Sequence, residues 1–199
     1  MKTVKTVTGP AEGITSEQRS TRVTDRKLSN LSRGAMFVAL AVGSGFALLM
    51  VPNIELITAV VFTSGVYVGT GWGLTVGIVA EFIFSAANPL GSGVVFLPML
   101  LAQMCGMGLV GAVGGRFRGL ARSSDWTWRR RTFFGAAGVV LTFIFDALTT
   151  LSYPLAAGYP VTQTAALFVT GIGFTFLHQV ANGVIFATAL PKVFSRLKP

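Results

Sequence analysis

Four ionisable side chains stand inside or at the edge of apolar stretches of this sequence: Glu55, Glu81, Asp146 and His178. Glu55 stands at the entrance of an apolar segment at 54–70, and Glu81 lies inside the next segment, at 72–87. A carboxylate within an apolar membrane span costs about 2.5–3.5 kcal/mol on insertion scales, and such residues typically mark substrate or ion pathways. We therefore expect Glu81 and Asp146 to serve a function beyond packing.

The composition is that of a polytopic membrane protein. Of the 199 residues, 52% are hydrophobic and only 12% are charged, and 24 are glycine. Residues 1–31 lack the apolar core of a signal peptide and are polar and mixed in charge, which predicts a disordered cytoplasmic tail. A single cysteine excludes a disulfide within the chain.

Apolar length and helix breakers predict an all-α membrane domain at 32–191, followed by a short basic cytoplasmic tail at 192–199. A glycine-rich turn at 69–73 separates the second span from the third. Six spans are expected, and they run at about 33–51, 54–70, 72–87, 94–114, 132–151 and 164–190.

The placement of charge sets the predicted topology. All 16 Lys and Arg residues lie at or before Arg33, at 116–131, or from Lys192 onward. When both termini lie on the cytoplasmic side of the cell inner membrane, every basic residue also lies on that side, as the positive-inside rule requires. The same placement argues against a nucleic-acid-binding surface, and it leaves the outer half of the bundle anionic.

Polar residues follow helical spacing on the later spans. Asp146 shares a face with Thr142 and Thr149, and His178 shares one with Asn182, while Gln103 lies on the fourth span. These stripes predict either a pocket or a set of hydrogen bonds between helices. Threonine and asparagine in membrane helices often serve only in packing.

Small residues predict a second surface. Ala35, Ala39 and Gly43 recur every four positions on the first span and form a flat ridge on which another helix can lie closely. The sequence has no G-x-x-x-x-G-K-[ST] loop, no H-E-x-x-H motif and no G-x-S-x-G motif, so it predicts neither an ATPase nor a common hydrolase, and no cofactor.

From about Leu31 to Leu190 the chain resembles the substrate-binding S components of energy-coupling factor transporters. The resemblance rests on its size, six spans, the ridge around Ala35 and Ala39, and the segment Pro52-Asn53-Ile54-Glu55-Leu56 with Asn88-Pro89 in the next outer loop. It implies capture of a vitamin or related micronutrient at the outer face, and delivery through a membrane coupling subunit and two cytoplasmic ATPases. In that family the first-helix ridge contacts the coupling subunit.

Depth and helical face, together with this resemblance, predict the substrate-binding residues. They are Glu55, Glu81, Asn88, Gln103, Asp146, Tyr153, Tyr159 and His178. Three carboxylates without an outward-facing basic residue favour a cationic or amine- and hydroxyl-rich nutrient, and thiamine-like and cobalamin-type heterocycles stay open. Cys105 or His178 could ligate a bound metal ion, although a lone membrane cysteine is more often a small buried hydrophobe.

Two other classes of protein fit the same sequence. A self-contained secondary carrier or channel would use Glu81, Asp146 and His178 as a proton or cation path. A membrane scaffold would use the basic loop at 116–131 with Trp126 and Trp128, although such residues are ordinary anchors at a membrane interface.

Overall fold

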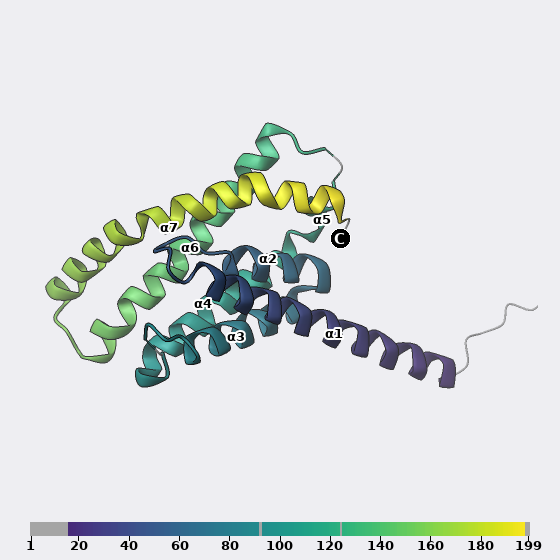
Figure 1. Ribbon diagram of the computed structural model, residues 1–199, viewed down its shortest axis with the longest axis horizontal. Coiled ribbons are helices and arrows are strands. Elements are labelled where there is room, and N and C mark those ends of the chain that lie inside the picture. Colours follow the sequence, from purple (N-terminus) through teal and green to yellow (C-terminus); the bar gives the residue numbers. More distant parts are fainter. Residues whose placement is uncertain (1–15, 92, 124, 198–199) are drawn as a thin grey trace, which may run out of the picture.

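The computed structural model describes residues 16–91, 93–123 and 125–197, and these residues form an all-helical bundle (Figure 1). Within them, four helices are long and apolar enough to cross a membrane and two further apolar helices are shorter, which indicates a multi-pass membrane protein. In chain order the elements are α1 (Ser16–Leu48), α2 (Ile57–Val68), α3 (Thr70–Ala86), the 3-10 turn η1 (Gly93–Val95), α4 (Leu97–Arg116), α5 (Arg118–Ala121), α6 (Trp128–Ala156) and α7 (Val161–Arg196).

Helix α1 is longer than the sequence predicts. The polar composition of residues 1–31 predicts a disordered tail, but the chain is helical from Ser16, and residues 1–15 lie outside the described part. No Gly or Pro occurs between Ser16 and Arg33, so nothing stops the helix from propagating outward from its apolar half. From Ser20 to Arg33 every residue except Asn30 is exposed, and this arm projects from the bundle (Figure 1).

Helix α2 is short, and this shortness shapes the candidate site. Its 12 residues extend about 18 Å, whereas the hydrocarbon core of a bilayer is about 30 Å thick. The connection at 49–56 that precedes it is not helical, and Asn53, with φ 60°, donates from Nδ2 to the carbonyl oxygen of Phe174 at 3.1 Å. Phe174 lies well inside α7, so the connection lies against the body of that helix.

Glycines bring α2, α3 and α4 into direct contact. A Cβ added at Gly111 would lie 1.9 Å from the carbonyl oxygen of Gly73, and one added at Gly65 would lie 2.0 Å from that of Gly111. Gly69, with φ 109°, is the only residue between α2 and α3, and it makes the predicted turn by itself. The regular glycine spacing of this region therefore serves packing.

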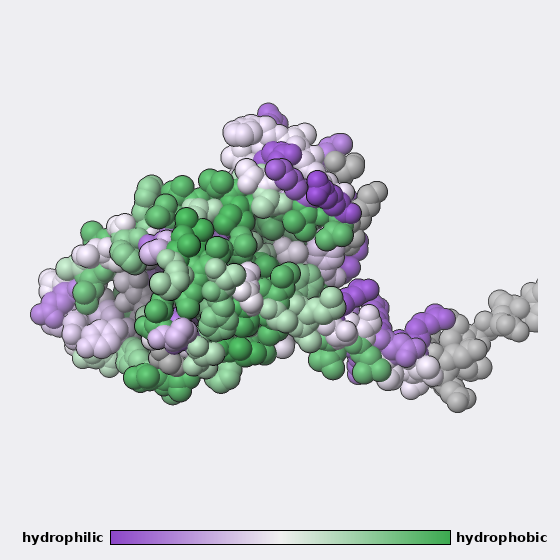
Figure 2. Space-filling view, viewed as in Figure 1, coloured by the Kyte–Doolittle hydropathy of each residue, from purple (hydrophilic) through white to green (hydrophobic). Residues whose placement is uncertain are grey.

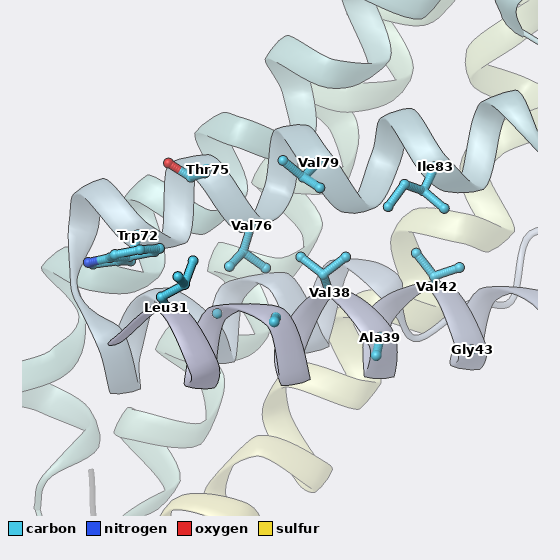
Figure 3. Close-up of a pocket in the computed structure, with 12 residues that line it drawn as sticks. Leu31, Val38, Ala39, Val42, Gly43, Trp72, Thr75, Val76, Val79 and Ile83 are labelled. Atoms are coloured by element: carbon cyan, nitrogen blue, oxygen red, sulfur yellow. The ribbon is translucent and has the colours of Figure 1, made fainter. Parts of the chain in front are cut away.

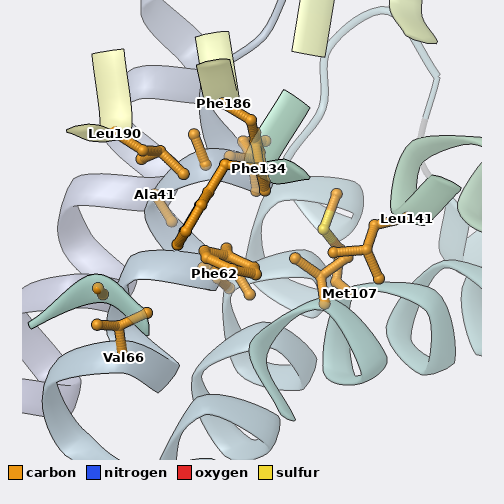
Figure 4. Close-up of a cluster of buried hydrophobic side chains, with 14 of the residues drawn as sticks. Ala41, Phe62, Val66, Met107, Phe134, Leu141, Phe186 and Leu190 are labelled. Atoms are coloured by element: carbon orange, nitrogen blue, oxygen red, sulfur yellow. The ribbon is translucent and has the colours of Figure 1, made fainter. Parts of the chain in front are cut away.

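Aromatic side chains form the core around the middle of α2. Phe62 lies with its ring centroid 5.4 Å from Phe117, 6.1 Å from Phe134 and 5.0 Å from Phe186, which joins α2 to α6 and α7 (Figure 4). Trp126 meets Phe134 of this group edge to face, with ring centroids 5.2 Å apart. Helix α6 packs along α7, α3 packs along α4, and the two pairs meet where α4 contacts α6.

The outer surface of the bundle is mostly apolar. Figure 2 shows hydrophobic residues covering the body of the bundle, while hydrophilic residues gather on the α1 arm and at the end of the bundle from which that arm projects. Many large hydrophobic side chains are exposed, among them Met36 at 69% and Phe174 at 71%. An apolar belt of this kind is what a bilayer covers.

Candidate functional site

Two of the three carboxyl groups in the apolar stretches meet at one histidine, His178. His178 Nδ1 of α7 lies 2.9 Å from Asp146 Oδ1 of α6, and His178 Nε2 lies 3.3 Å from Glu55 Oε1. Asp146 and His178 are buried, at 4% and 8% exposure. An imidazole that donates from both ring nitrogens carries a positive charge. With both carboxylates ionised, the arrangement is a carboxylate–imidazolium–carboxylate chain that joins α6, α7 and the α1–α2 connection.

Three amide groups donate further hydrogen bonds to these two carboxylates. Asn182 Nδ2 donates to Glu55 Oε1 at 2.7 Å, Gln179 Nε2 donates to Asp146 Oδ2 at 3.4 Å, and the backbone amide of Thr58 donates to Glu55 Oε2 at 2.9 Å. On α7, Gln179 directly follows His178, and Asn182 lies one turn after it. Both carboxylates thus have partners for each oxygen, which is how buried charge is normally stabilised.

Glu81 is not part of the hydrogen-bonded cluster around His178. It is 3% exposed on α3 and makes no hydrogen bond with any residue that the structure describes. Ser85, one turn further along α3, is turned toward α4, where its hydroxyl donates to Gln103 Oε1 at 2.9 Å. Glu81 is therefore the one buried carboxyl of this region without a partner among the described residues.

The other predicted substrate contacts do not join the cluster. Gln103 pairs with Ser85, and Asn88 Oδ1 accepts a hydrogen bond from the backbone amide of Leu90 within its own loop. The rings of Tyr153 and Tyr159 meet edge to face, with centroids 5.7 Å apart, and both are exposed. Within the described part of the chain, neither tyrosine makes a hydrogen bond or ring contact with Glu55, Asp146 or His178.

A protein metal site finds no support in the described residues. Among them no group of three His, Cys, Asp or Glu side chains is arranged to hold a metal ion, and Cys105 is exposed on α4. The exposed position differs from the buried one that is typical of a lone cysteine. In a bilayer, a thiol on the outside of the bundle faces lipid.

A second feature lies on the outside of the bundle, between α1 and α3. It is an apolar groove of about 600 Å³, and Val38 and Val42 of α1 point toward α3 within it (Figure 3). The predicted docking residues Ala35, Ala39 and Gly43 are exposed and line it. The remaining lining residues are Leu31, Gly34, Val38, Val42, Trp72, Thr75, Val76, Val79 and Ile83.

Comparisons with protein-family models, with curated proteins and with solved structures found no match. Among the residues that build the cluster, Asn182 stood out in the sequence only as a packing residue, and Gln179 and Thr58 did not stand out at all. Gln179 could have been found as the neighbour of a buried histidine, but Thr58 contributes a backbone amide, which leaves no trace in the sequence.

Proposed function

We propose that this chain is the substrate-capture subunit of an ATPase-driven uptake system for a vitamin or a related small micronutrient, of the energy-coupling factor class that its sequence resembles. In this proposal α1, α3, α4, α6 and α7 cross the cell inner membrane, α2 crosses it together with the non-helical connection at 49–56, and both termini lie in the cytoplasm. The protein is not an enzyme. It binds its nutrient from outside and passes it on with a membrane coupling subunit and two cytoplasmic ATPases.

One observation carries the capture function: a non-helical, charged segment lies against the body of a long apolar helix. Asn53 and Glu55, in the connection at 49–56, bond to Phe174, His178 and Asn182 of α7. Irregular backbone at membrane depth is tolerated only where it is buried in protein or lines a cavity, and intramembrane charges mark binding sites. A substrate site beside Glu55 accounts for both features.

The lengths of α6 and α7 support entry of the nutrient from one end of the bundle. Their 29 and 36 residues extend about 44 and 54 Å, and together they form a hairpin that continues past the cluster (Figure 1). Glu55, at the cluster, keeps 19% of its side chain exposed. A nutrient entering along this hairpin would meet the exposed rings of Tyr153 and Tyr159 before it reached Glu55.

The groove between α1 and α3 supports the proposal that a coupling subunit docks on this protein. It is lined almost wholly by apolar side chains, and its small residues allow a helix to approach the α1 backbone closely. It contains none of the ionisable residues of the cluster. Capture and docking therefore use separate surfaces, as a subunit that binds first and couples later requires.

Mass spectrometry tests the capture function. The full-length protein is purified in mild detergent and denatured, and the released small molecules are quantified. We expect one nutrient-sized molecule at close to one equivalent per chain. Glu55→Gln should lower this yield at least tenfold, whereas Asp25→Asn, the same change on the exposed α1 arm, should leave it unchanged. A protein that carries nothing and binds no nutrient from a vitamin panel would contradict the proposal.

The chain of hydrogen bonds through His178 favours a second candidate, a proton-coupled carrier. Imidazole between two carboxylates can accept a proton on one side and release one on the other. This candidate predicts nutrient uptake by liposomes that contain the purified protein alone, driven by a pH gradient. Uptake that requires ATP and the coupling proteins excludes the carrier and supports the capture subunit.

A further inference from the structure

A second, smaller apolar groove lies on the outside of the bundle, where α1, α2 and α7 meet. Its volume is about 190 Å³, and Phe37 of α1, Val60 of α2 and Ala189 of α7 are among the residues that line it. Thr63 also lines it, but its hydroxyl donates to the carbonyl oxygen of Ala59 at 2.7 Å and is therefore already satisfied. None of these residues lines the groove between α1 and α3. The chemistry of this smaller groove suits a hydrocarbon chain.

Ring contacts hold the two walls of this smaller groove on either side of the end of α2. Phe37 of α1 lies 6.2 Å from Tyr67 of α2, and Tyr67 lies 6.2 Å from Phe194 of α7, measured between ring centroids. The Tyr67 hydroxyl also donates to the carbonyl oxygen of Leu197, just after α7. Figure 1 shows the C-terminal end of α7 at the same end of the bundle as the α1 arm. The groove therefore leads toward the end of the bundle where hydrophilic residues gather.

Basic residues continue the lining faces of both walls beyond the groove. On α1, Arg33 lies one helical turn before Phe37, and on α7, Lys192 and Arg196 follow Ala189 by three and seven residues. Residues at these spacings share a helix face. The three basic side chains are exposed and form no hydrogen bond or ion pair with any residue that the structure describes. The positive-inside rule accounts for basic residues at this end of the bundle, but not for their position on the two faces that line the groove.

We propose that this groove binds an anionic phospholipid of the cytoplasmic leaflet, with an acyl chain between α1, α2 and α7 and the phosphate at Arg33, Lys192 and Arg196. Basic residues between membrane helices on the cytoplasmic side bind anionic head groups, and Arg donates to a phosphate through two parallel hydrogen bonds. A second copy of this chain does not suit the groove, because it would bring further basic side chains to the same end. The inference rests on the proposed orientation in the membrane and is independent of nutrient capture.

The probes are dioleoylphosphatidylglycerol, which is anionic, and dioleoylphosphatidylcholine, which has the same chains and no net charge. Each is added to the full-length protein in detergent after removal of lipid; native mass spectrometry counts the lipids retained, and Tm is measured. We expect one phosphatidylglycerol to be retained and to raise Tm by about 5–10 °C at a concentration about 100 times Kd, whereas phosphatidylcholine should have little effect. Equal stabilisation by the two lipids would overturn the choice of an anionic lipid.

Charge variants test the site of the phosphate. Arg33→Gln and Lys192→Gln should each weaken the binding of phosphatidylglycerol about fivefold, because a basic residue near an anionic membrane surface contributes about 1 kcal/mol. Both side chains are exposed and without a partner among the described residues, so both variants should fold. Arg129→Gln, the same loss of charge at an exposed position near the start of α6, is the matched control and should have no effect. An equal loss in the Arg129 variant would show attraction by net charge alone and would overturn the site.

A further pair of variants tests the site of the acyl chain. Ala189→Trp fills the groove from an exposed position, and it should weaken the binding of phosphatidylglycerol by about 5- to 150-fold, which corresponds to overpacking of about 1–3 kcal/mol. Val184→Trp, at an exposed position on α7 outside the groove, is the control and should bind as the native chain does. If Ala189→Trp bound the lipid unchanged, or if inorganic phosphate raised Tm as much as the lipid, the groove would not hold an acyl chain and the proposal would be wrong.

Discussion

Asn182 of α7 donates a hydrogen bond of 2.7 Å to Glu55, which lies 127 residues earlier in the connection between α1 and α2. The contact ties the non-helical connection to the last helix of the bundle. Glu55 also accepts a hydrogen bond from the backbone amide of Thr58, at the start of α2. One carboxylate therefore sets both the start of a short helix and the position of the connection on α7.

The first prediction concerns His178, which lies between two carboxylates. His178→Ala should lower the free energy of unfolding by about 3–5 kcal/mol, because it leaves Glu55 and Asp146 buried and without their shared cation. Glu55→Gln and Asp146→Asn should each cost less, since either variant retains one carboxylate opposite one imidazolium. Unfolding in detergent with increasing SDS measures these differences. If the histidine variant were the mildest of the three, the charge arrangement described here would be wrong.

The elements could be predicted from the sequence because each depends on local features. Apolar runs that end at Pro52-Asn53 or at Gly69 identify the helices whatever their neighbours are. The helical arm before Arg33 was not predicted, because polar composition does not separate a disordered segment from the extension of an apolar helix. The absence of Gly and Pro between Ser16 and Arg33 was the feature of the sequence that could have predicted this arm.

The site could be predicted only in part. Glu55, Asp146 and His178 stand out because charge is rare in apolar segments, but their contact depends on how α6 and α7 are rotated and on how far the 49–56 connection enters the bundle. Neither is set by spacing within one helix. Gln103 illustrates the limit: its depth matched that of the acids, yet its side chain pairs with Ser85 of α3.

The second prediction concerns the glycine contacts of α4. Gly111→Ala should cost about 1–3 kcal/mol and lower Tm by about 2–12 °C, because the new methyl group would lie 1.9 Å from the carbonyl oxygen of Gly73 and must push α3 and α4 apart. Gly71→Ala is the control: a Cβ there meets nothing within 4 Å, and alanine favours the helix. A Gly111 variant as stable as the Gly71 variant would contradict this packing.

The third prediction concerns the sidedness of the six proposed membrane helices. In a Cys105→Ser background, Ala157→Cys, between α6 and α7, should react with a membrane-impermeant maleimide on intact cells. Gly119→Cys, in α5 near the basic loop, should react only after the cells are permeabilised. Both residues are exposed, so access to the reagent depends on the membrane alone. The reverse labelling pattern would place the termini outside.

The last prediction separates docking from capture at the groove between α1 and α3. Ala39→Trp places a large side chain at an exposed position that lines the groove, so a partner helix that packs there loses close contact. Overpacking of about 1–3 kcal/mol corresponds to about a 5- to 150-fold loss of affinity for the coupling subunit. Nutrient uptake by cells should fall accordingly, while the nutrient-induced rise in Tm of the purified protein should stay unchanged, because the groove contains none of the cluster residues. Ala136→Trp, at an exposed position on α6, is the matched control and should leave both measurements unchanged. If Ala39→Trp abolished nutrient binding as well, the two surfaces would not be independent, and the division between capture and docking would be incorrect.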